Sequence, residues 1–337
     1  MLIGDNFPLR PSGPRGTIPS VIWRSEPVTG GDDISWKALG RIVREWAGDP
    51  AELTEVIPLA GGSVNNTLLL VTGDHRKAVL KITPHRVDRE LVNEAHQLDL
   101  LRDLGLPVPQ LYLKHPGSLE DPNTYILIEF VDGITLAAAK KQLPESDYDS
   151  LQHQLAELVL KLHAHTRDTY GKVDISGNHQ ETNWPAFYRS LHDHSVQAVE
   201  QVSEIPIKMR RKIEKLHSRL DQYLTHADQP RLCHGDMWGK NVMVNQDETG
   251  AWKIKALLDP TLRYAHFEYE LAYMDLFDTC SKTFKRDYQN GHKLNDDYHK
   301  IRKPIYQLYP LMDNVQFFGQ KYVAPLMQVA ERACAVV

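Results

Sequence analysis

Asp236, Asn241 and Asp259 are the residues of this chain whose types and spacing could do chemistry. Asp236 follows His234 and Gly235, and four residues separate it from Asn241. A carboxylate can accept the proton of a hydroxyl group, and an amide and a second carboxylate are oxygen ligands suited to Mg²⁺. Phosphoryl transfer to a hydroxyl group requires these groups together. We therefore predict Asp236 as the catalytic residue and Asn241 and Asp259 as the magnesium ligands.

The segments between these residues predict how they come together. A short apolar run, Val242–Val244, is followed by a polar turn, and a second strand-like run, Trp252–Leu258, ends on Asp259. A loop, a hairpin and the end of a strand would place all three side chains at one spot. His-Gly-Asp alone is a common turn tripeptide, so the added spacing and the hairpin carry the prediction.

The residues around Lys81 are candidates for holding a nucleotide. Gly61 and Gly62 lie in a turn between two strand candidates, where backbone N–H groups can approach a phosphate because glycine has no Cβ. An ordinary hairpin is the alternative for this turn. Strand alternation puts Lys81 on the opposite face from Leu80 and Ile82, although a solvated lysine is the alternative here too.

The helix predicted after Lys81 offers an acidic partner. Leu91, Glu94 and Leu98 recur on one face, so Glu94 falls in an apolar stripe where an unpaired carboxylate is costly to desolvate. An ion pair with Lys81 would remove that cost. Glu90, one turn earlier, is the alternative partner, and we favour Glu94.

A strongly strand-forming run, Thr124–Val131, precedes an Asp-Gly turn. We predict that backbone groups of Glu129 and Val131 hydrogen-bond an adenine at the end of this strand. A buried strand without that role is the alternative, and both interpretations can hold together.

The pattern of the chain predicts an arm and two lobes. Residues 1–31 are rich in Pro, Gly and Arg and form an N-terminal arm. Residues 32–131 form an antiparallel β N-lobe with one key helix, which would bind the nucleotide. Residues 132–337 form a mainly α-helical C-lobe with the catalytic loop, the metal ligands and the acceptor site. The predicted fold class is therefore α+β.

Composition excludes several classes of protein. The formal net charge of the 337 residues is −5, which gives no general electrostatic case for nucleic acid or an anionic membrane as partner. The three cysteines are widely spaced and match neither a disulfide framework nor a zinc site. No apolar run approaches membrane-spanning length and the start lacks a signal-peptide core, so we expect a cytoplasmic protein.

The order of these residues resembles the aminoglycoside phosphotransferase-like kinases, which have HGD where protein kinases have HRD. Within that superfamily the chain is most similar to the fructosamine (ketosamine) kinase family. Three segments carry this resemblance: HGDMWGKN at 234–241, LLDPTLRYAHFEYELAYMDLF at 257–277 and IYQLYPLMDNVQFFGQKY at 305–322. The family pattern for the second segment is DPA-x-YYGHREADLAMTELF. Here Thr261 replaces Ala, Ala265 replaces Gly, Phe267 replaces Arg and Glu270 replaces Asp.

The resemblance implies a two-lobed protein-kinase-like fold, with ATP and Mg²⁺ as cofactors. Lys81, positioned by Glu94, would hold the α- and β-phosphates beneath the Gly61-Gly62 turn. The implied acceptor is the 3′-hydroxyl of a small-molecule ketosamine such as a fructosamine or ribulosamine, which implies a deglycation role. The departures from the family pattern bear on this acceptor rather than on ATP and Mg²⁺ chemistry.

Two alternatives remain open. Another small-molecule kinase of the aminoglycoside or choline type would keep every motif and change only the acceptor pocket. A non-catalytic nucleotide-binding pseudokinase usually lacks the lysine, the HGD aspartate or the metal-binding aspartate, and this chain has all of them.

Overall fold

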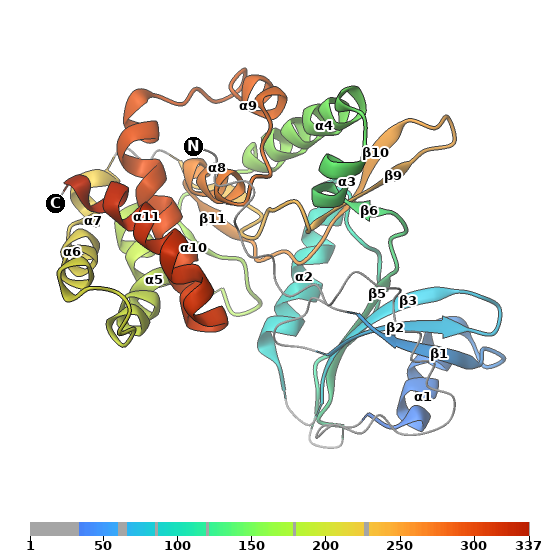
Figure 1. The fold of residues 1–337 in the computed structure, drawn as a ribbon. Coiled ribbons are helices and arrows are strands. Elements are labelled where there is room, and N and C mark those ends of the chain that lie inside the picture. Colours follow the sequence, from blue (N-terminus) through green and yellow to red (C-terminus); the bar gives the residue numbers. More distant parts are fainter. Residues whose placement is uncertain are drawn as a thin grey trace. The chain divides into compact units, whose positions relative to one another are not determined.

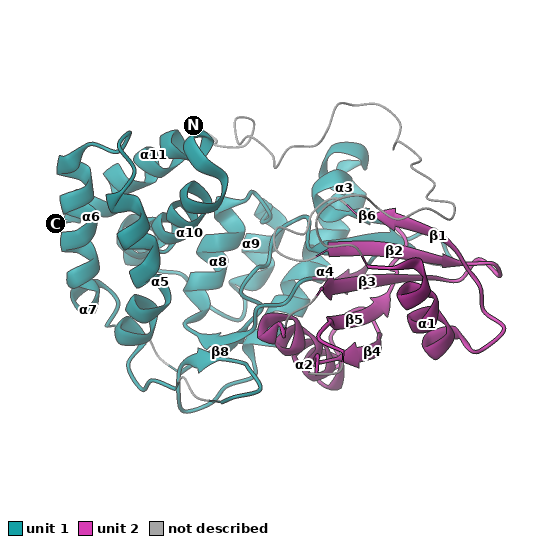
Figure 2. Ribbon diagram, turned by 90° about the horizontal axis from the view of Figure 1, so that it is seen from below, with its two compact units in different colours: residues 1–11, 134–254, 259–337 teal, residues 12–133, 255–258 magenta. Residues whose placement is uncertain are grey.

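The computed structural model describes residues 34–59, 66–84, 87–118, 121–177, 180–225 and 229–336. Gly61, Gly62 and the predicted arm, residues 1–31, lie outside these ranges. The described chain forms two compact units, which Figure 2 colours separately. Among the described residues, the smaller unit includes those from Ile34 to Gly133 and the short segment Lys255–Leu258, and the larger unit includes the remainder.

The smaller unit is built on an antiparallel five-stranded sheet with the order β1-β2-β3-β5-β4. Its strands are β1 (Leu53–Pro58), β2 (Asn66–Thr72), β3 (Lys77–Thr83), β4 (Leu111–His115) and β5 (Thr124–Glu129). β3 lies inside the sheet, where Lys81 pairs with Thr67 on one side and with Ile126 on the other. The antiparallel β unit predicted from the alternating pattern is therefore present.

One helix packs against each face of this sheet. α1 (Trp36–Ala47) begins at Ser35, whose hydroxyl accepts the Ala38 N–H at 3.2 Å. It contributes Leu39, Ile42 and Val43 to a core shared with Leu80 and Ile82. α2 (Arg89–Asp103) contributes Leu91, Ala95 and Leu98 to a second core, with Ile126 and Ile128 of β5. Because strand faces alternate, Lys81 lies on the face of α2.

The larger unit is mainly helical. Its helices are α3 (Leu136–Gln142), α4 (Glu145–His163), α5 (Trp184–Glu200), α6 (Ile207–Ser218), α7 (Leu220–Tyr223), α8 (Phe267–Leu276), α9 (Lys282–Tyr288), α10 (Lys303–Phe318) and α11 (Val323–Ala333), with short π or 3₁₀ turns η1 (Tyr298–Arg302), η2 (Gly319–Tyr322) and η3 (Cys334–Val336). α10 packs against α5, α8 and α11, and α4 packs against α9 (Figure 1).

Two small sheets lie among these helices, with the orders β10-β9-β6 and β7-β11-β8. Their strands are β6 (Ile134–Thr135), β7 (Gly171–Lys172), β8 (Arg231–Cys233), β9 (Val242–Gln246), β10 (Trp252–Leu257) and β11 (Arg263–Ala265). β9 and β10 are the hairpin that the sequence predicts after Asn241. The chain is therefore α+β, as predicted.

Arg302 and Glu268 form a buried, bidentate ion pair that joins η1 to α8. Nε and Nη2 of Arg302 each donate to a Glu268 carboxylate oxygen at 2.6 Å, and Nη2 also donates to Asn295 at 2.8 Å. The two side chains are 5% and 4% exposed. Removing either side chain would leave the other charge buried and unpaired.

We expect Arg302→Met to lower the free energy of unfolding by about 3–5 kcal/mol, because Glu268 would lose the cation that compensates its burial. Urea denaturation followed by circular dichroism measures this change. Lys300→Met is the matched control, since Lys300 is 71% exposed in its pair with Asp296. That control should change stability by less than about 0.5 kcal/mol, and equal effects of the two variants would contradict the prediction.

His192 is a buried histidine of α5 that lies between aromatic rings. Its ring centroid is 4.8 Å from that of Tyr188 and 4.7 Å from that of Tyr309. Neither ring nitrogen has a hydrogen-bond partner among the described residues. Burial, followed by the positive charge of Arg263, lowers the pKa of His192 well below its ordinary value of 6.5. The folded protein therefore holds this imidazole neutral.

Stability should consequently fall as the pH drops below 6.5, where the unfolded chain binds a proton that folded His192 does not. His192→Phe removes this contribution, so the variant should gain stability relative to the natural chain by up to about 1.4 kcal/mol per pH unit as the pH falls below that value. Urea unfolding at several pH values between neutrality and mild acid measures the difference. His299→Gln, at an exposed position, serves as control. A constant offset between His192→Phe and the natural chain at every pH would count against the prediction.

Candidate active site

The pairing of β8 with β11 positions the loop that carries Asp236. The strands are antiparallel, with Cys233 opposite Arg263, and the Thr261 N–H donates to the His234 carbonyl at 2.9 Å. The residues after Cys233 therefore run alongside the residues before Arg263. Asp236 lies in the first segment and Asp259 in the second, so the two carboxylates predicted to act together lie in adjoining loops.

Gly235 makes the turn that presents Asp236. Its φ is +84°, and a Cβ at this position would lie 2.2 Å from the Thr261 carbonyl oxygen. Both observations require glycine, the first by backbone conformation and the second by space. Asp259 also has a positive φ, +53°, which aspartate tolerates better than most residues.

Asn241 and Tyr273 hold the carboxylate of Asp236 through different oxygens. Nδ2 of Asn241 donates to Oδ2 of Asp236 at 2.9 Å and to the Asp236 carbonyl at 3.0 Å. The Tyr273 hydroxyl donates to Oδ1. Because the amide nitrogen of Asn241 faces Asp236, its amide oxygen points elsewhere and can act as a ligand for a cation.

Glu270 binds the backbone of the same loop. This residue of α8 is 1% exposed, and its two carboxylate oxygens accept the Gly235 N–H at 2.8 Å and pair with Nε2 of His163 at 2.9 Å. Nδ1 of His163 lies 2.7 Å from the Tyr288 hydroxyl. Burial acts to raise the pKa of Glu270, but the hydrogen bond and charge of His163 outweigh it and lower that pKa overall.

Cys233 lies beside this anchor and behaves as a packed core thiol. Its Sγ and the ligand atoms of His163 and Glu270 lie within 4.8 Å of one another. Burial raises the pKa of Cys233 well above its ordinary value, so the thiol stays protonated. Both ring nitrogens of His163 already have hydrogen-bond partners, so neither is available to a metal ion. The three residues therefore form a structural cluster rather than a metal site.

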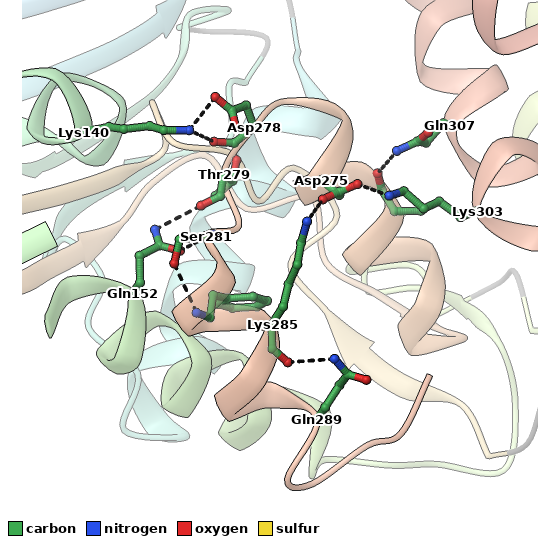
Figure 3. Close-up of polar contacts among 12 residues, drawn as sticks. Lys140, Gln152, Asp275, Asp278, Thr279, Ser281, Lys285, Gln289, Lys303 and Gln307 are labelled. Atoms are coloured by element: carbon green, nitrogen blue, oxygen red, sulfur yellow. Dashed lines mark hydrogen bonds and ion pairs between the residues drawn. The ribbon is translucent and has the colours of Figure 1, made fainter. Parts of the chain in front are cut away.

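The segment after α8 supports the loop from a second direction. Oγ1 of Thr279 accepts the Gly239 N–H at 3.1 Å. Figure 3 shows how this segment is held: Nζ of Lys140 lies 2.5 Å from an Asp278 carboxylate oxygen, and Gln152 donates to the Thr279 carbonyl at 3.0 Å. Hydrogen bonds to side chains thus fix the loop that carries Asp236 at both Gly235 and Gly239.

In the smaller unit, the predicted ion pair of Lys81 and Glu94 is confirmed. Nζ of Lys81 lies 2.5 Å from Oε1 of Glu94, and the side chains are 13% and 14% exposed. Glu90, the alternative partner, is exposed at the start of α2. Strand alternation and helix periodicity together predicted the correct carboxylate.

Glu129 and Val131 lie at the end of β5 and just beyond it. The Glu129 N–H donates to the Gln110 carbonyl at 2.8 Å, and the Glu129 side chain accepts the Gln110 N–H at 3.1 Å. The Glu129 N–H is therefore committed within the protein, so Val131 is the better candidate for donating a hydrogen bond to a base.

A comparison with models of known protein families shows which family the chain belongs to. The model of the family described as fructosamine kinase matches residues 35–335. The chain belongs to the fructosamine kinase family. It is therefore a kinase, and the resemblance predicted from its motifs is confirmed.

Individual relatives agree with this membership. A probable ketoamine kinase from Enterococcus faecium is 28% identical over 286 residues, which are 82% of this chain and 94% of the relative. The structure of a candidate fructosamine-3-kinase from Thermobifida fusca is 22% identical, with a TM-score of 0.69 over 90% of this chain and 100% of that one.

A more distant structural neighbour is an aminoglycoside phosphotransferase, APH(4)-Ia, in a complex with AMP-PNP and hygromycin B. It is 18% identical, with a TM-score of 0.60 over 88% of this chain and 95% of that chain. At this identity the likeness concerns the fold alone. This fructosamine kinase family member thus has the predicted two-lobed protein-kinase-like fold.

Three residues that contact the loop of Asp236 are not predicted from the sequence: Glu270, Tyr273 and Thr279. Glu270 was noted only as a departure from the family pattern. Its spacing from Tyr273, one helical turn apart, puts both on one face of α8 and could have pointed to a shared target. Nothing in the spacing indicated that this target is the loop of Asp236.

Proposed function

We propose that this family member transfers the terminal phosphoryl group of ATP to a hydroxyl group of a ketosamine, such as a fructosamine or ribulosamine. The observation that carries the proposal is the carboxylate of Asp236, which Asn241 and Tyr273 hold on a loop anchored by Glu270. The Enterococcus faecium relative supports ketosamines as the acceptor class, because its description is that of a probable ketoamine kinase.

In this mechanism Asp236 orients the acceptor hydroxyl and takes its proton as the new O–P bond forms. The bond from the γ-phosphorus to its bridging oxygen breaks at the same time, and ADP leaves. The amide oxygen of Asn241 and the carboxylate of Asp259 fit an oxygen-ligating cation, and Mg²⁺ there would neutralise the charge on the phosphates. Orientation and charge neutralisation supply most of the acceleration in such transfers.

The smaller unit would hold the nucleotide. Lys81, fixed by Glu94, would pair with the α- and β-phosphates. The carbonyl of Glu129 and the N–H of Val131 offer an acceptor and a donor for the adenine edge. Gly61 and Gly62, outside the described residues, would lie over the phosphates. We also propose that the protein acts in the cytoplasm; across the described residues no helix is long and apolar enough to span a bilayer.

Glu94→Gln should raise KM for ATP by about tenfold or more, because a neutral amide no longer fixes the Lys81 ammonium group through an ion pair. Initial rates of ADP release measured over a range of ATP concentrations give this value. Glu90→Gln is the matched control, since Glu90 is an exposed residue on the same helix. If both variants had the same KM for ATP, Lys81 would not depend on Glu94.

The acceptor is tested by measuring ATP turnover with a panel of fructosamines, ribulosamines, aminoglycosides and choline. We expect turnover with ketosamines. Turnover with aminoglycosides or choline alone would reject the ketosamine proposal and leave the kinase assignment intact.

A further inference from the structure

Tyr273 makes a contact at the catalytic carboxylate that the proposed mechanism does not use. It lies on α8, and its hydroxyl donates a hydrogen bond to Oδ1 of Asp236. Its ring packs on Phe277 with the centroids 4.8 Å apart. This packing restricts the rotamers of Tyr273, so its hydroxyl stays within hydrogen-bonding reach of the carboxylate.

The two oxygens of Asp236 are held by two different donors. Asn241 binds Oδ2, and Tyr273 binds Oδ1. Together these bonds fix the rotation of the carboxylate about its own axis. Each carboxylate oxygen has a further lone pair, so an acceptor hydroxyl can still donate to Asp236 while both bonds persist.

We propose that Tyr273 is a positioning residue for the catalytic base: its phenol orients the Asp236 carboxylate toward the acceptor hydroxyl. This inference rests on the proposed role of Asp236.

The first test reads the orientation of the carboxylate and needs no acceptor. A crystal structure of Tyr273→Phe should show the Asp236 carboxylate rotated about its own axis, because Oδ1 has lost its donor while Asn241 still holds Oδ2. Replacing Tyr273 with 3-fluorotyrosine, which keeps the donor, should leave the carboxylate in its original orientation.

The second test is kinetic and uses the ketosamine that gives turnover. Tyr273→Phe and Tyr273→Met should lower kcat by about 10- to 100-fold and leave KM for ATP unchanged, whereas the 3-fluorotyrosine protein should keep most of the turnover. Tyr223→Phe is the matched control, because it removes a different hydroxyl, the one that Tyr223 of α7 donates to the Val336 carbonyl. That control should leave kcat and KM for ATP unchanged.

The outcomes separate this inference from the proposed function. An unchanged kcat in Tyr273→Phe, or an unchanged orientation of the Asp236 carboxylate in its crystal structure, would overturn the inference. Full turnover by Asp236→Asn would overturn the proposed function instead. If Tyr273→Phe failed to fold, Tyr273→Met, which also lacks the donor, would be measured in its place.

Discussion

Asp236→Asn should lower kcat by about 10²- to 10⁴-fold and leave KM for ATP nearly unchanged. The amide has the size of the carboxylate and can stay on the loop beside Asn241, but it cannot take the proton of the acceptor hydroxyl. The effect therefore belongs to the transition state rather than to nucleotide binding. Steady-state rates of ADP release at saturating acceptor, with ATP varied, separate the two quantities.

Asp296→Asn is the control for this variant, because Asp296 is 84% exposed and pairs only with Lys300 among the described residues. It should keep the turnover of the natural chain. Full turnover by Asp236→Asn would mean that the proton leaves by another route and that the assignment of the base is wrong.

Glu270→Ala should lower kcat by about 100-fold or more and also destabilise the fold. The truncation leaves the Gly235 N–H without its acceptor and Nε2 of His163 without its partner, both in a buried place. Losing such an acceptor costs about 1–3 kcal/mol for each buried group, and a shift of Asp236 by about 1 Å would account for the lost turnover. Activity assays and urea unfolding measure the two parts.

Glu270→Gln is the informative companion variant. Its amide oxygen can still accept the Gly235 N–H, and its amide nitrogen can donate to His163 in the appropriate tautomer. We expect it to retain most of the turnover that Glu270→Ala loses. If the two variants were equally impaired, the negative charge of Glu270 would matter rather than its hydrogen bonds.

The departures from the family pattern divide according to what each side chain contacts. Glu270 replaces Asp but still holds the Gly235 N–H, so the polar anchor of the loop is kept with a longer side chain. Thr261 replaces Ala and receives bonds from Arg263 at its carbonyl and its hydroxyl, both at 3.2 Å. The departures change the surroundings of Asp236 and leave its own side chain in place.

Local patterns were sufficient for the elements and for one contact between them. The alternation of β3 and the helical period of α2 place Lys81 and Glu94 on facing surfaces, and a buried charge requires a partner, so the sequence alone determined their ion pair. The hairpin β9–β10 and the helical character after residue 134 follow from periods of two and 3.6 residues in the same way. The roles of Asp236, Asn241 and Asp259 are predictions that rest on their chemistry and spacing.

Tertiary structure alone decided what surrounds Asp236. Glu270, Tyr273 and Thr279 are distant in sequence from the loop that they contact. These contacts depend on how α8 and the segment after it pack against β8 and the loop. No period of the sequence encodes that packing, because it results from the summed burial of many side chains on several helices. The sequence thus determined which residues could react, and the tertiary structure decided which residues hold Asp236 and its loop.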